Sequence, residues 1–321
     1  MHKSIITGLG YYLPENVVTN DDLAQMIDTN DKWITERTGI KERRWIEPGT
    51  DTTASMGLKA AKVAIANANL KANDIDFIIF ATLSPDYYFP GPGVQLQEAL
   101  EIDTIGALDV RNQCSGFIYA LSVADQYIKS GMYKNILVVG SEHHSAGLEK
   151  TDRGRGVTVI FGDGAGAAVV SATDDQNRGI LSTHLHSQGQ HAKELALISP
   201  ATQNWVDKII EKNDPDDASY YPYMNGNFVF KHAVTRFPQV IMEALDQNGF
   251  KPTDLKVLIP HQANLRISQF VQKTMGLSND QVYNNIQKYG NTTAASIPIA
   301  LAEAYEKGII EKGDLVCLAA F

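Results

Sequence analysis

Residues 104–131 read Thr-Ile-Gly-Ala-Leu-Asp-Val-Arg-Asn-Gln-Cys-Ser-Gly-Phe-Ile-Tyr-Ala-Leu-Ser-Val-Ala-Asp-Gln-Tyr-Ile-Lys-Ser-Gly, which places a cysteine between a strand and a helix. The apolar run 105–110 predicts a short buried strand, and apolar residues recur at helical spacing from Gly116. Cys114 therefore lies at a strand-to-helix turn, where the free N–H groups of the helix favour thiolate over thiol. The alternative is an unreactive thiol, because most free cysteines are small buried hydrophobes.

Around this stretch strands and helices alternate, which predicts a layered α/β protein with a largely parallel sheet. We expect helices at residues 20–27, 30–38 and 53–70, and strands at 3–9, 77–82, 136–140, 157–161, 167–171, 256–260 and 315–321. The glycines of 162–166 resemble a dinucleotide loop, but a strand follows where a helix is required, so a hairpin is the better interpretation. Residues 199–222, rich in Asp, Asn, Pro and Tyr, predict a surface insertion.

Composition narrows the class of protein. The chain has 321 residues of which 44% are hydrophobic, and no apolar run is long enough to span a membrane, as expected for a soluble globular protein. Two cysteines do not make a disulfide framework, which favours a reducing cytoplasm. The net charge of −9 argues against nucleic acid or an anionic membrane as a partner. An acidic protein partner would need a local basic patch.

The sequence also repeats itself. Residues 72–80 match residues 252–260 in pattern, and each segment follows a long helix. The helix after Cys114 that ends at Gly131 has the same length as the helix after Asn291 that ends at Gly308. We therefore expect a duplicated fold in which Cys114 and Asn291 occupy equivalent places, with halves at 1–175 and 176–321. Chance similarity between amphipathic helices is the alternative.

Two further polar residues lie at predicted junctions between strands and helices. His261 follows the strand 256–260, and strand ends are where reacting groups collect in α/β sheets. Asn291 precedes the repeated helix, where a helix cap is the simplest interpretation. A lone histidine is usually structural, so it is the shared location with Cys114 that favours a catalytic role for both.

Several motifs together resemble the β-ketoacyl-acyl-carrier-protein synthase III family, the initiating condensing enzymes of bacterial fatty acid synthesis. They are Asp-Lys-Trp-Ile-Thr-Glu-Arg-Thr-Gly-Ile (31–40), Gln-Cys-Ser-Gly (113–116), Thr-Asp-Arg-Gly (151–154), Phe-Gly-Asp-Gly-Ala-Gly-Ala-Ala (161–168), Pro-His-Gln-Ala-Asn-Leu-Arg-Ile (260–267) and Tyr-Gly-Asn-Thr-Thr-Ala-Ala-Ser-Ile-Pro (289–298). The resemblance implies a thiolase-like fold, with two βαβαβαββ halves in an αβαβα core, and a triad of Cys114, His261 and Asn291. It implies no metal and no redox cofactor.

The implied reaction joins an acyl-CoA, acetyl-CoA being the expected primer, to malonyl-acyl-carrier protein. Cys114 takes the acyl group as a thioester. His261 Nε2 and the Asn291 amide then donate hydrogen bonds to the enolate formed by decarboxylation.

The resemblance also assigns binding residues. Contacts to CoA, the pantetheine arm and the acyl group fall on Trp33, Arg37, Arg153, Gly226, Asn264 and Phe321. The loop at 153–156 is longer than in many relatives, so Arg155 is an alternative to Arg153. Phe89 is expected to reach the acyl pocket of a partner subunit, which implies a homodimer. Carrier-protein docking falls on Lys231, Arg266 and Lys273, which would supply the local basic patch.

The end of the sequence departs from the family pattern. Relatives continue past the equivalent of Phe321 with a glycine-rich turn and a last strand, and one of those glycines contributes to the oxyanion hole for thioester attack. We expect either an additional tail or an impaired enzyme.

Three alternatives to fatty acid initiation stay open at this point: a specialised condensing enzyme of secondary metabolism, a non-catalytic partner subunit of the same fold, and a cysteine hydrolase. A metal site at His184, His186 and His191 is weakly indicated, because no cysteine or carboxylate near them completes a ligand set.

Overall fold

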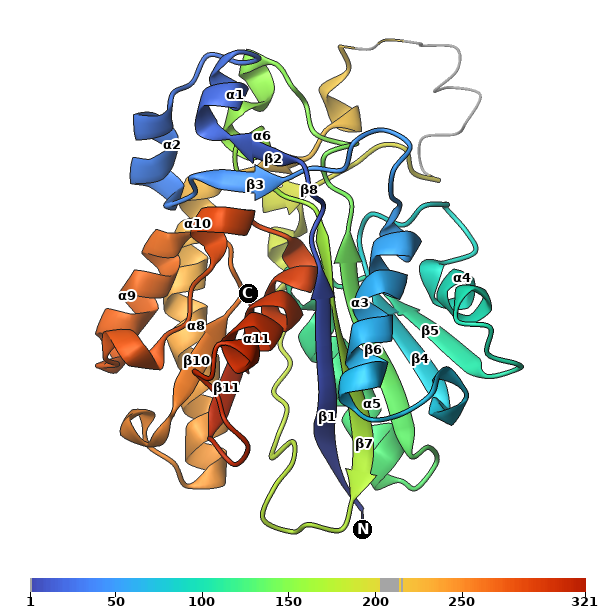
Figure 1. The fold of residues 1–321 in the computed structure, drawn as a ribbon. Coiled ribbons are helices and arrows are strands. Elements are labelled where there is room, and N and C mark those ends of the chain that lie inside the picture. Colours follow the sequence, from blue (N-terminus) through green and yellow to red (C-terminus); the bar gives the residue numbers. More distant parts are fainter. Residues whose placement is uncertain (1, 203–213, 215) are drawn as a thin grey trace.

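The computed structural model describes residues 2–202, 214 and 216–321 (Figure 1). Its main sheet has five strands in the order β1-β7-β6-β4-β5. These are β1 (Lys3–Tyr12), β4 (Phe77–Ala81), β5 (Gly106–Val110), β6 (Asn135–Glu142) and β7 (Gly164–Thr173). β4 pairs in parallel with β5 and β6, whereas β7 runs antiparallel to β6 and β1.

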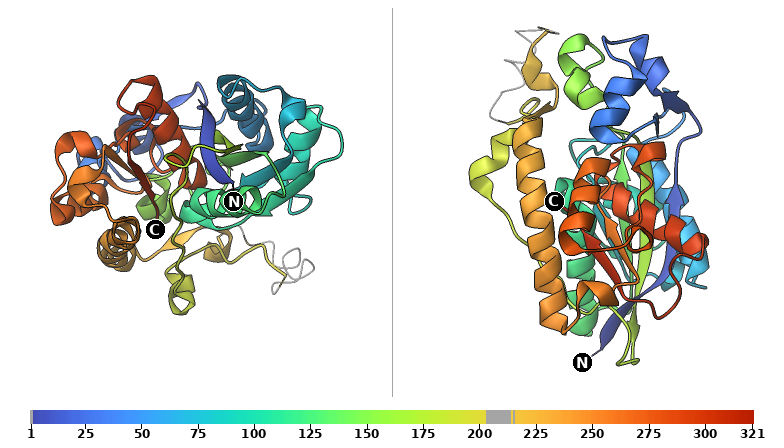
Figure 2. Two further views of the ribbon diagram at one scale, coloured as in Figure 1. Left: turned by 90° about the horizontal axis from the view of Figure 1, so that it is seen from below. Right: turned by 90° about the vertical axis from the view of Figure 1, so that its left-hand side faces the viewer.

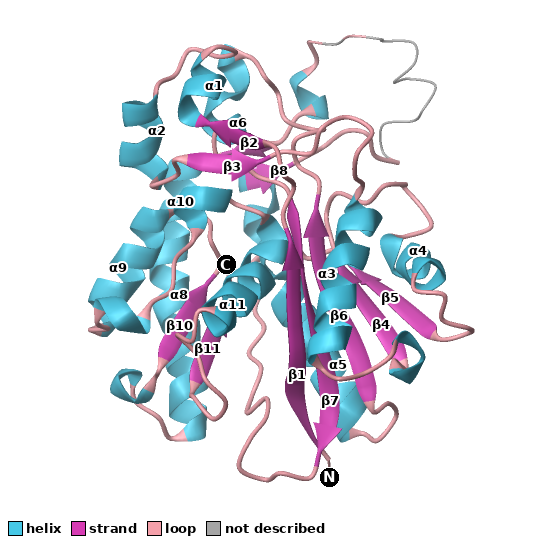
Figure 3. Cartoon of the chain, viewed as in Figure 1, coloured by secondary structure: helices cyan, strands magenta, loops and turns pink. Residues whose placement is uncertain are grey.

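A second, smaller sheet pairs β10 (Val257–Pro260) with β11 (Val316–Ala319) in parallel. Between the two sheets lie α5 (Gly116–Lys129) and α11 (Ser296–Glu306), whose apolar side chains pack with residues of both sheets. Helices α3 (Thr53–Asn67) and α4 (Pro92–Ala99) cover the other face of the main sheet. Helices α8 (Gly226–Asn248) and α9 (Leu265–Met275) cover the outer face of the small sheet. The layers therefore follow the order α, β, α, β, α, and α8 runs along one side of the molecule (Figures 2 and 3).

The remaining described strands and helices are short. They are β2 (Val17–Thr19), α1 (Asn20–Ala24), α2 (Asp31–Thr38), β3 (Glu42–Arg44), α6 (Arg155–Thr158), β8 (Leu195–Ala196), β9 (Tyr223–Met224) and α10 (Ile286–Tyr289), with 3-10 turns η1 (Ala72–Asp74), η2 (Gln113–Ser115), η3 (Asp152–Gly154), η4 (Gly189–Glu194), η5 (Ala218–Tyr220), η6 (Pro252–Asp254), η7 (Asn279–Gln281) and η8 (Thr293–Ala295). None of the helices that the structure describes is long and apolar enough to cross a membrane.

Helix α5 is amphipathic, as the spacing of its apolar residues predicts. Its apolar residues share one face, and Phe117, Leu121, Ala124 and Ile128 are all buried in the core cluster between the sheets. This burial removes their apolar surface from water and fixes the orientation of the helix. The helix thereby fixes the turn that carries Cys114, three residues before Phe117.

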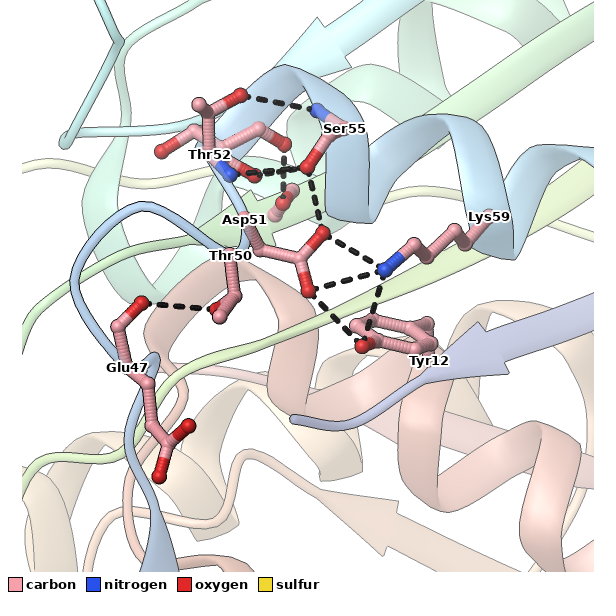
Figure 4. Close-up of polar contacts among 9 residues, drawn as sticks. Tyr12, Glu47, Thr50, Asp51, Thr52, Ser55 and Lys59 are labelled. Atoms are coloured by element: carbon pink, nitrogen blue, oxygen red, sulfur yellow. Dashed lines mark hydrogen bonds and ion pairs between the residues drawn. The ribbon is translucent and has the colours of Figure 1, made fainter. Parts of the chain in front are cut away.

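A polar cluster at the end of β1 anchors α3 (Figure 4). The carboxylate of Asp51 accepts hydrogen bonds from Ser55 Oγ (2.7 Å), from the Tyr12 hydroxyl (2.9 Å) and from Lys59 Nζ (2.7 Å). The ammonium of Lys59 also lies 4.1 Å above the Tyr12 ring, a cation–π contact. The first turns of α3 are therefore tied to the main sheet.

Helices and strands of the first half recur in the second half at a constant offset in sequence, but this offset changes within the last helix. η1 and η6, β4 and β10, and the starts of α5 and α11 are each 180 positions apart. The last helical residues, Lys129 and Glu306, are only 177 apart, because α11 is one turn shorter. The expected equivalence of Cys114 and Asn291 is therefore wrong by about one turn, and the counterpart of Cys114 is Ala294.

The predicted strand at 157–161 is also wrong. The chain forms the helical turn α6 there, and the Thr158 hydroxyl donates to the carbonyl of Glu149 over 2.5 Å. β-Branched residues gave a strand signal, but this segment packs in the cluster of Ile34 and Trp45 instead of lying beside a strand. The glycines that follow lead into β7, so 157–171 is not a hairpin.

Other predicted bounds need small changes. The first helix ends at Ala24 and is capped by Thr19, and the third ends at Asn67. Much of the predicted insertion at 199–222 lies outside the described residues.

Candidate active site

Cys114 lies in the 3-10 turn η2, between the end of β5 and the start of α5. Its neighbour Gln113 has φ +44°, and in the facing turn η8 Thr293 has φ +49°, which is strained for side chains other than glycine. The two turns contact each other, and η8 also contacts β6. Gly140 of β6 makes this approach possible, because a Cβ there would lie 2.4 Å from the carbonyl oxygen of Ala294.

His261 directly follows β10, as predicted, and is buried. Its backbone N–H donates to the carbonyl of Ala319 in β11 over 2.7 Å, which extends the pairing of the small sheet by one residue. Its Nδ1 atom lies 2.6 Å from the hydroxyl of Ser296. Its Nε2 atom is buried and has no hydrogen-bond partner among the described residues. A ring nitrogen in this state is available to a substrate atom.

Asn291 follows the helical turn α10 and not a strand. Its backbone N–H donates to the carbonyl of Ile160 (2.9 Å), and its carbonyl accepts from the N–H of Gly162 (3.0 Å). Gly290 permits this contact, because its φ is +64° and a Cβ would lie 2.7 Å from the Ile160 oxygen. The side-chain Oδ1 of Asn291 accepts from the N–H of Thr293 over 2.8 Å. This bond orients the amide so that its NH₂ group faces away from the turn.

One broad cavity is lined by Cys114, His261 and Asn291 together. Trp33, Arg37, Gly226, Asn264, Arg266 and Phe321 line the same cavity. Most of the residues that the sequence assigned to substrate binding are therefore brought to one connected space, although they come from both halves of the chain.

The electrostatics of Cys114 correct the expectation of a thiolate. Burial, with a smaller contribution from the charge of Glu142, raises the pKa of the Cys114 thiol to about 12. The backbone N–H of Cys114 itself lowers the pKa, but its effect is smaller than the cost of burying a charge. At neutral pH Cys114 is therefore a neutral thiol.

Glu142, at the end of β6, is the buried charge beside this thiol. Its carboxylate accepts from the hydroxyls of Thr82 (3.1 Å) and Ser84 (2.5 Å) and from the N–H of Leu83 (3.2 Å). Burial raises the pKa of Glu142 to about 7 in spite of these bonds. Glu142 therefore fixes the segment after β4 against β6, next to the reactive turn.

A second buried histidine, His144, lines the same cavity as His261. His144 Nε2 is 2.6 Å from the hydroxyl of Thr293, and its ring packs 4.8 Å from the ring of Phe161. Burial lowers the pKa of both His144 and His261 to about 3. Both rings are neutral at physiological pH, so neither can act as a strong acid.

The predicted adenine site is built around Trp33 of α2. The guanidinium of Arg37 lies 4.5 Å from the centre of its ring, and that of Arg155 lies 4.9 Å from it. Arg153 is engaged elsewhere, since its Nε donates to Glu149 over 2.6 Å and its Nη1 to the carbonyl of Asp216 over 2.7 Å. Arg155, the sequence-based alternative, is therefore the arginine beside Trp33.

The two predicted pantetheine contacts differ in what their positions allow. Gly226 begins α8, and its place on the cavity wall leaves room for a ligand chain. Asn264 caps α9 through Oδ1, and its Nδ2 donates to the carbonyl of Arg37 over 2.9 Å. The side chain of Asn264 thus joins α9 to α2, and its amide already has partners on both sides.

Phe89 lies apart from the cavity, in the loop between β4 and α4, with 81% of its surface exposed. Its neighbours Tyr87 and Tyr88 are also largely exposed. Phe321 lines the cavity and lies 6.4 Å from the ring of Phe237. The predicted docking residues Lys231, Arg266 and Lys273 are all exposed on the paired helices α8 and α9.

The three histidines considered for a metal do not converge on one point. His184 Nδ1 and His186 Nε2 each contact the carboxylate of Glu243, at 3.0 and 2.7 Å. His191 packs instead against the rings of Phe228 and His232. In the described part of the chain, no group of three or more His, Cys, Asp or Glu residues is placed to hold a metal ion.

Sequence reasoning missed Glu142, His144 and Ser296. Both Glu142 and His144 lie at or just after the end of β6, so the strand-end argument that identified His261 could have found them. Ser296 is 35 positions from His261, and no pattern in the sequence connects the two.

Two layers of sheet around a pair of central helices, one of which begins beside a cysteine, define the thiolase-like class of condensing enzyme. The family model for 3-oxoacyl-[acyl-carrier-protein] synthase III matches residues 108–189, and the model for its C-terminal part matches residues 245–321. The chain is 44% identical over 321 residues to β-ketoacyl-[acyl-carrier-protein] synthase III of Caldanaerobacter subterraneus subsp. tengcongensis, covering 98% of this chain and 93% of that protein.

Solved structures agree. A 3-oxoacyl-[acyl-carrier-protein] synthase III from Aquifex aeolicus has a TM-score of 0.89 and 42% identity, covering 100% of this chain and 96% of the other. The priming β-ketosynthase of the R1128 polyketide pathway has a TM-score of 0.88 and 31% identity, covering 98% and 91%. The chain belongs to the β-ketoacyl-[acyl-carrier-protein] synthase III family, and it is an acyltransferase that carries out the initiating condensation of fatty acid synthesis.

Proposed function

We propose that the protein condenses acetyl-CoA with malonyl-acyl-carrier protein through an acetyl group held on Cys114. The observation that supports this most is the shared cavity of Cys114, His261 and Asn291, in which His261 Nε2 has no hydrogen-bond partner among the residues that the structure describes. The proposed halves are 1–175, which supplies the nucleophile, and 176–321, which supplies the other two groups.

In the first step the sulfur of Cys114 attacks the thioester carbonyl of acetyl-CoA. The bond from the carbonyl carbon to the CoA sulfur breaks, CoA leaves as a thiol with the proton lost by Cys114, and an acetyl thioester remains on the protein.

In the second step malonyl-carrier protein takes the place of CoA. The bond between its α-carbon and its carboxylate breaks, and CO₂ leaves. The electron pair of that bond stays on the α-carbon and is delocalised as an enolate. His261 Nε2–H and Asn291 Nδ2–H donate to the enolate oxygen, a stabilisation that typically contributes a factor of about 10² to 10³ per donor. Because the pKa of His261 is about 3, its ring is neutral and is too weak an acid to protonate the carbanion. The carbanion attacks the acetyl carbonyl, and the bond from that carbon to the Cys114 sulfur breaks. Cys114 leaves as a thiolate, which takes one proton from solvent to restore the resting thiol.

For the nucleotide end of CoA we propose Trp33, Arg37 and Arg155. The two guanidinium groups that flank Trp33 provide a flat, positively charged site for adenine and phosphate. We propose that Gly226 and Asn264 lie beside the pantetheine arm. Gly226 leaves space for the arm, and Asn264 acts by capping the end of α9 that faces it.

Carrier-protein docking is proposed at Lys231, Arg266 and Lys273. The guanidinium of Arg266 lies 5.5 Å from the ring of Phe230, which precedes Lys231 in α8. A positive cluster on a chain with net charge −9 suits an acidic protein partner.

We further propose a cytoplasmic homodimer. Phe89, Tyr87 and Tyr88 form an exposed aromatic group, which is uncommon on a monomer and is explained by burial against a second copy.

The test is product formation with a panel of primers. Acetyl-, isobutyryl-, octanoyl- and benzoyl-CoA are each supplied with malonyl-carrier protein, and the carrier protein is analysed by mass. We expect acetoacetyl-carrier protein as the preferred product. Preference for a long or aromatic primer would favour the specialised enzyme of secondary metabolism, whereas free acid would indicate a hydrolase and no product a non-catalytic subunit.

A further inference from the structure

Ser296 is the first residue of α11, and it is 2% exposed, beside the 4% exposed ring of His261. The two residues come from different elements, since His261 follows β10. Ser296 Oγ lies 2.6 Å from His261 Nδ1. This is a short hydrogen bond, and it is buried from solvent. This hydrogen bond therefore determines which nitrogen of the His261 ring carries the proton.

The direction of this hydrogen bond follows from the other partner of Ser296. The N–H of Gln262 points at Ser296 Oγ over 3.4 Å, and an N–H can only donate. Among the described residues, His261 Nδ1 is the one atom in hydrogen-bond contact with this hydroxyl that can accept its hydrogen. If Nδ1 carried a proton, the hydroxyl hydrogen would be buried without an acceptor, which proteins strongly avoid.

The neutral imidazole has one proton, so a hydrogen bond from Ser296 to Nδ1 leaves that proton on Nε2. Nε2 is buried, and within the described part of the chain it has no hydrogen-bond partner. With its proton there, the atom is a donor facing the cavity; without it, the atom would repel an oxygen that carries negative charge.

We propose that Ser296 is a positioning residue that holds His261 in the Nε2–H tautomer. The identity of the acceptor, the enolate oxygen of decarboxylated malonyl-carrier protein, rests on the proposed function. The tautomer itself does not, because it follows from contacts of the unliganded protein.

The first test is direct and independent of activity. The full chain is labelled with ¹⁵N-histidine, and the two ring nitrogens of His261 are observed by NMR near neutral pH, with assignment from the signal lost in His261→Asn. We expect a protonated Nε2 in the wild type and in Ser296→Thr, and a mixture of tautomers in Ser296→Ala. A wild-type ring protonated on Nδ1, or an unchanged tautomer in Ser296→Ala, would overturn the proposal.

The second test separates the two half-reactions. In Ser296→Ala, acetyl transfer from CoA to Cys114 should stay within about twofold of wild type. Condensation with malonyl-carrier protein should fall by about tenfold, short of the roughly 10²- to 10³-fold loss typical for removal of a donor. Ser296→Thr, which keeps the hydroxyl, should restore most of the rate.

Equal loss in both half-reactions, with altered thermal unfolding, would show a structural role and overturn the proposal. A changed tautomer with no malonyl-dependent activity in any variant, wild type included, would instead contradict the proposed function and leave the role of Ser296 standing.

Discussion

Thr293 donates its backbone N–H to Oδ1 of Asn291 over 2.8 Å, and this bond determines which end of the amide can reach a substrate. Asn291→Asp keeps an acceptor for Thr293 but replaces the NH₂ group with an oxygen that cannot donate. We expect condensation to fall by about 10² to 10³-fold, while acetyl transfer from CoA to Cys114 is kept.

Asn279→Asp is the matched control, since it makes the same chemical change at an exposed position in the turn η7. It should leave both half-reactions unchanged. Comparable condensation rates in the Asn291→Asp and wild-type proteins would remove Asn291 from the mechanism.

The reactivity of Cys114 should rise steadily with pH. Since burial raises its pKa to about 12, the thiolate fraction increases about tenfold per pH unit throughout the range 7 to 9. Alkylation by a small reagent should follow that slope without a plateau, measured in a Cys317→Ala protein so that only Cys114 reports. A plateau near pH 8 would mean that the helix end overcomes burial, as the sequence alone suggested.

The two arginines of the 153–155 segment should differ in their effect on CoA binding. Arg155 lies beside Trp33, so Arg155→Ala is expected to raise the KM for acetyl-CoA about three- to tenfold, in line with the loss of a cation–π contact and a phosphate partner. Arg153→Ala should change KM less, because its guanidinium is held by Glu149. Acetyl-pantetheine, which lacks the nucleotide, should show no such difference, and the opposite ranking of the two variants would assign the site to Arg153.

Protonation of His144 should weaken the fold in mild acid. Its folded pKa of about 3 lies below the ordinary value of 6.5, so stability is present above pH 6.5 and is lost as pH falls toward 3. Between pH 6.5 and 5.0 this one group should remove about 1.5 kcal/mol from the free energy of unfolding. His261 adds a loss of the same sign, whereas Glu142, with its raised pKa, acts in the opposite direction.

Comparing the pH dependence of the free energy of unfolding in wild type and in His144→Gln isolates the contribution of His144. The contributions of the other titrating groups are the same in both proteins and cancel. Urea unfolding at the two pH values should show a smaller pH dependence in His144→Gln by that amount, with His2→Ala, an exposed site, as the control. An identical pH dependence in the two proteins would show that His144 is not buried as a neutral ring.

Much of the fold could be predicted from local pattern. Apolar periodicity was enough for α5 and for the buried strands β4 and β10, since each buries its apolar face whatever surrounds it. The segment at 157–161 could not be predicted, because its β-branched residues suit a strand only if another strand lies beside them, and the chain turns away there. Pairing of that kind is a property of the whole fold.

The site was predictable where a reactive residue follows a strand, as at His261 and Cys114. It was not predictable where contacts join distant parts of the chain. The choice between Arg153 and Arg155 depends on Asp216 and Trp33, and the state of the His261 ring depends on Ser296. The protonation of Cys114 was misjudged for a related reason, because burial is a tertiary property and exceeds the local effect of the helix end.

The proposed reaction depends most on Cys114 as the carrier of the acyl group, and one measurement tests this role directly. The protein is incubated with acetyl-CoA, its intact mass is read, and the modified peptide is located in the wild type, Cys317→Ala and Cys114→Ser. We predict a single acetyl group on Cys114 in the first two proteins, discharged when malonyl-carrier protein is added, and none in Cys114→Ser. An acetyl group that persists in Cys114→Ser, or release of free acetate without malonyl-carrier protein, would contradict the role of Cys114 as the acyl carrier in condensation.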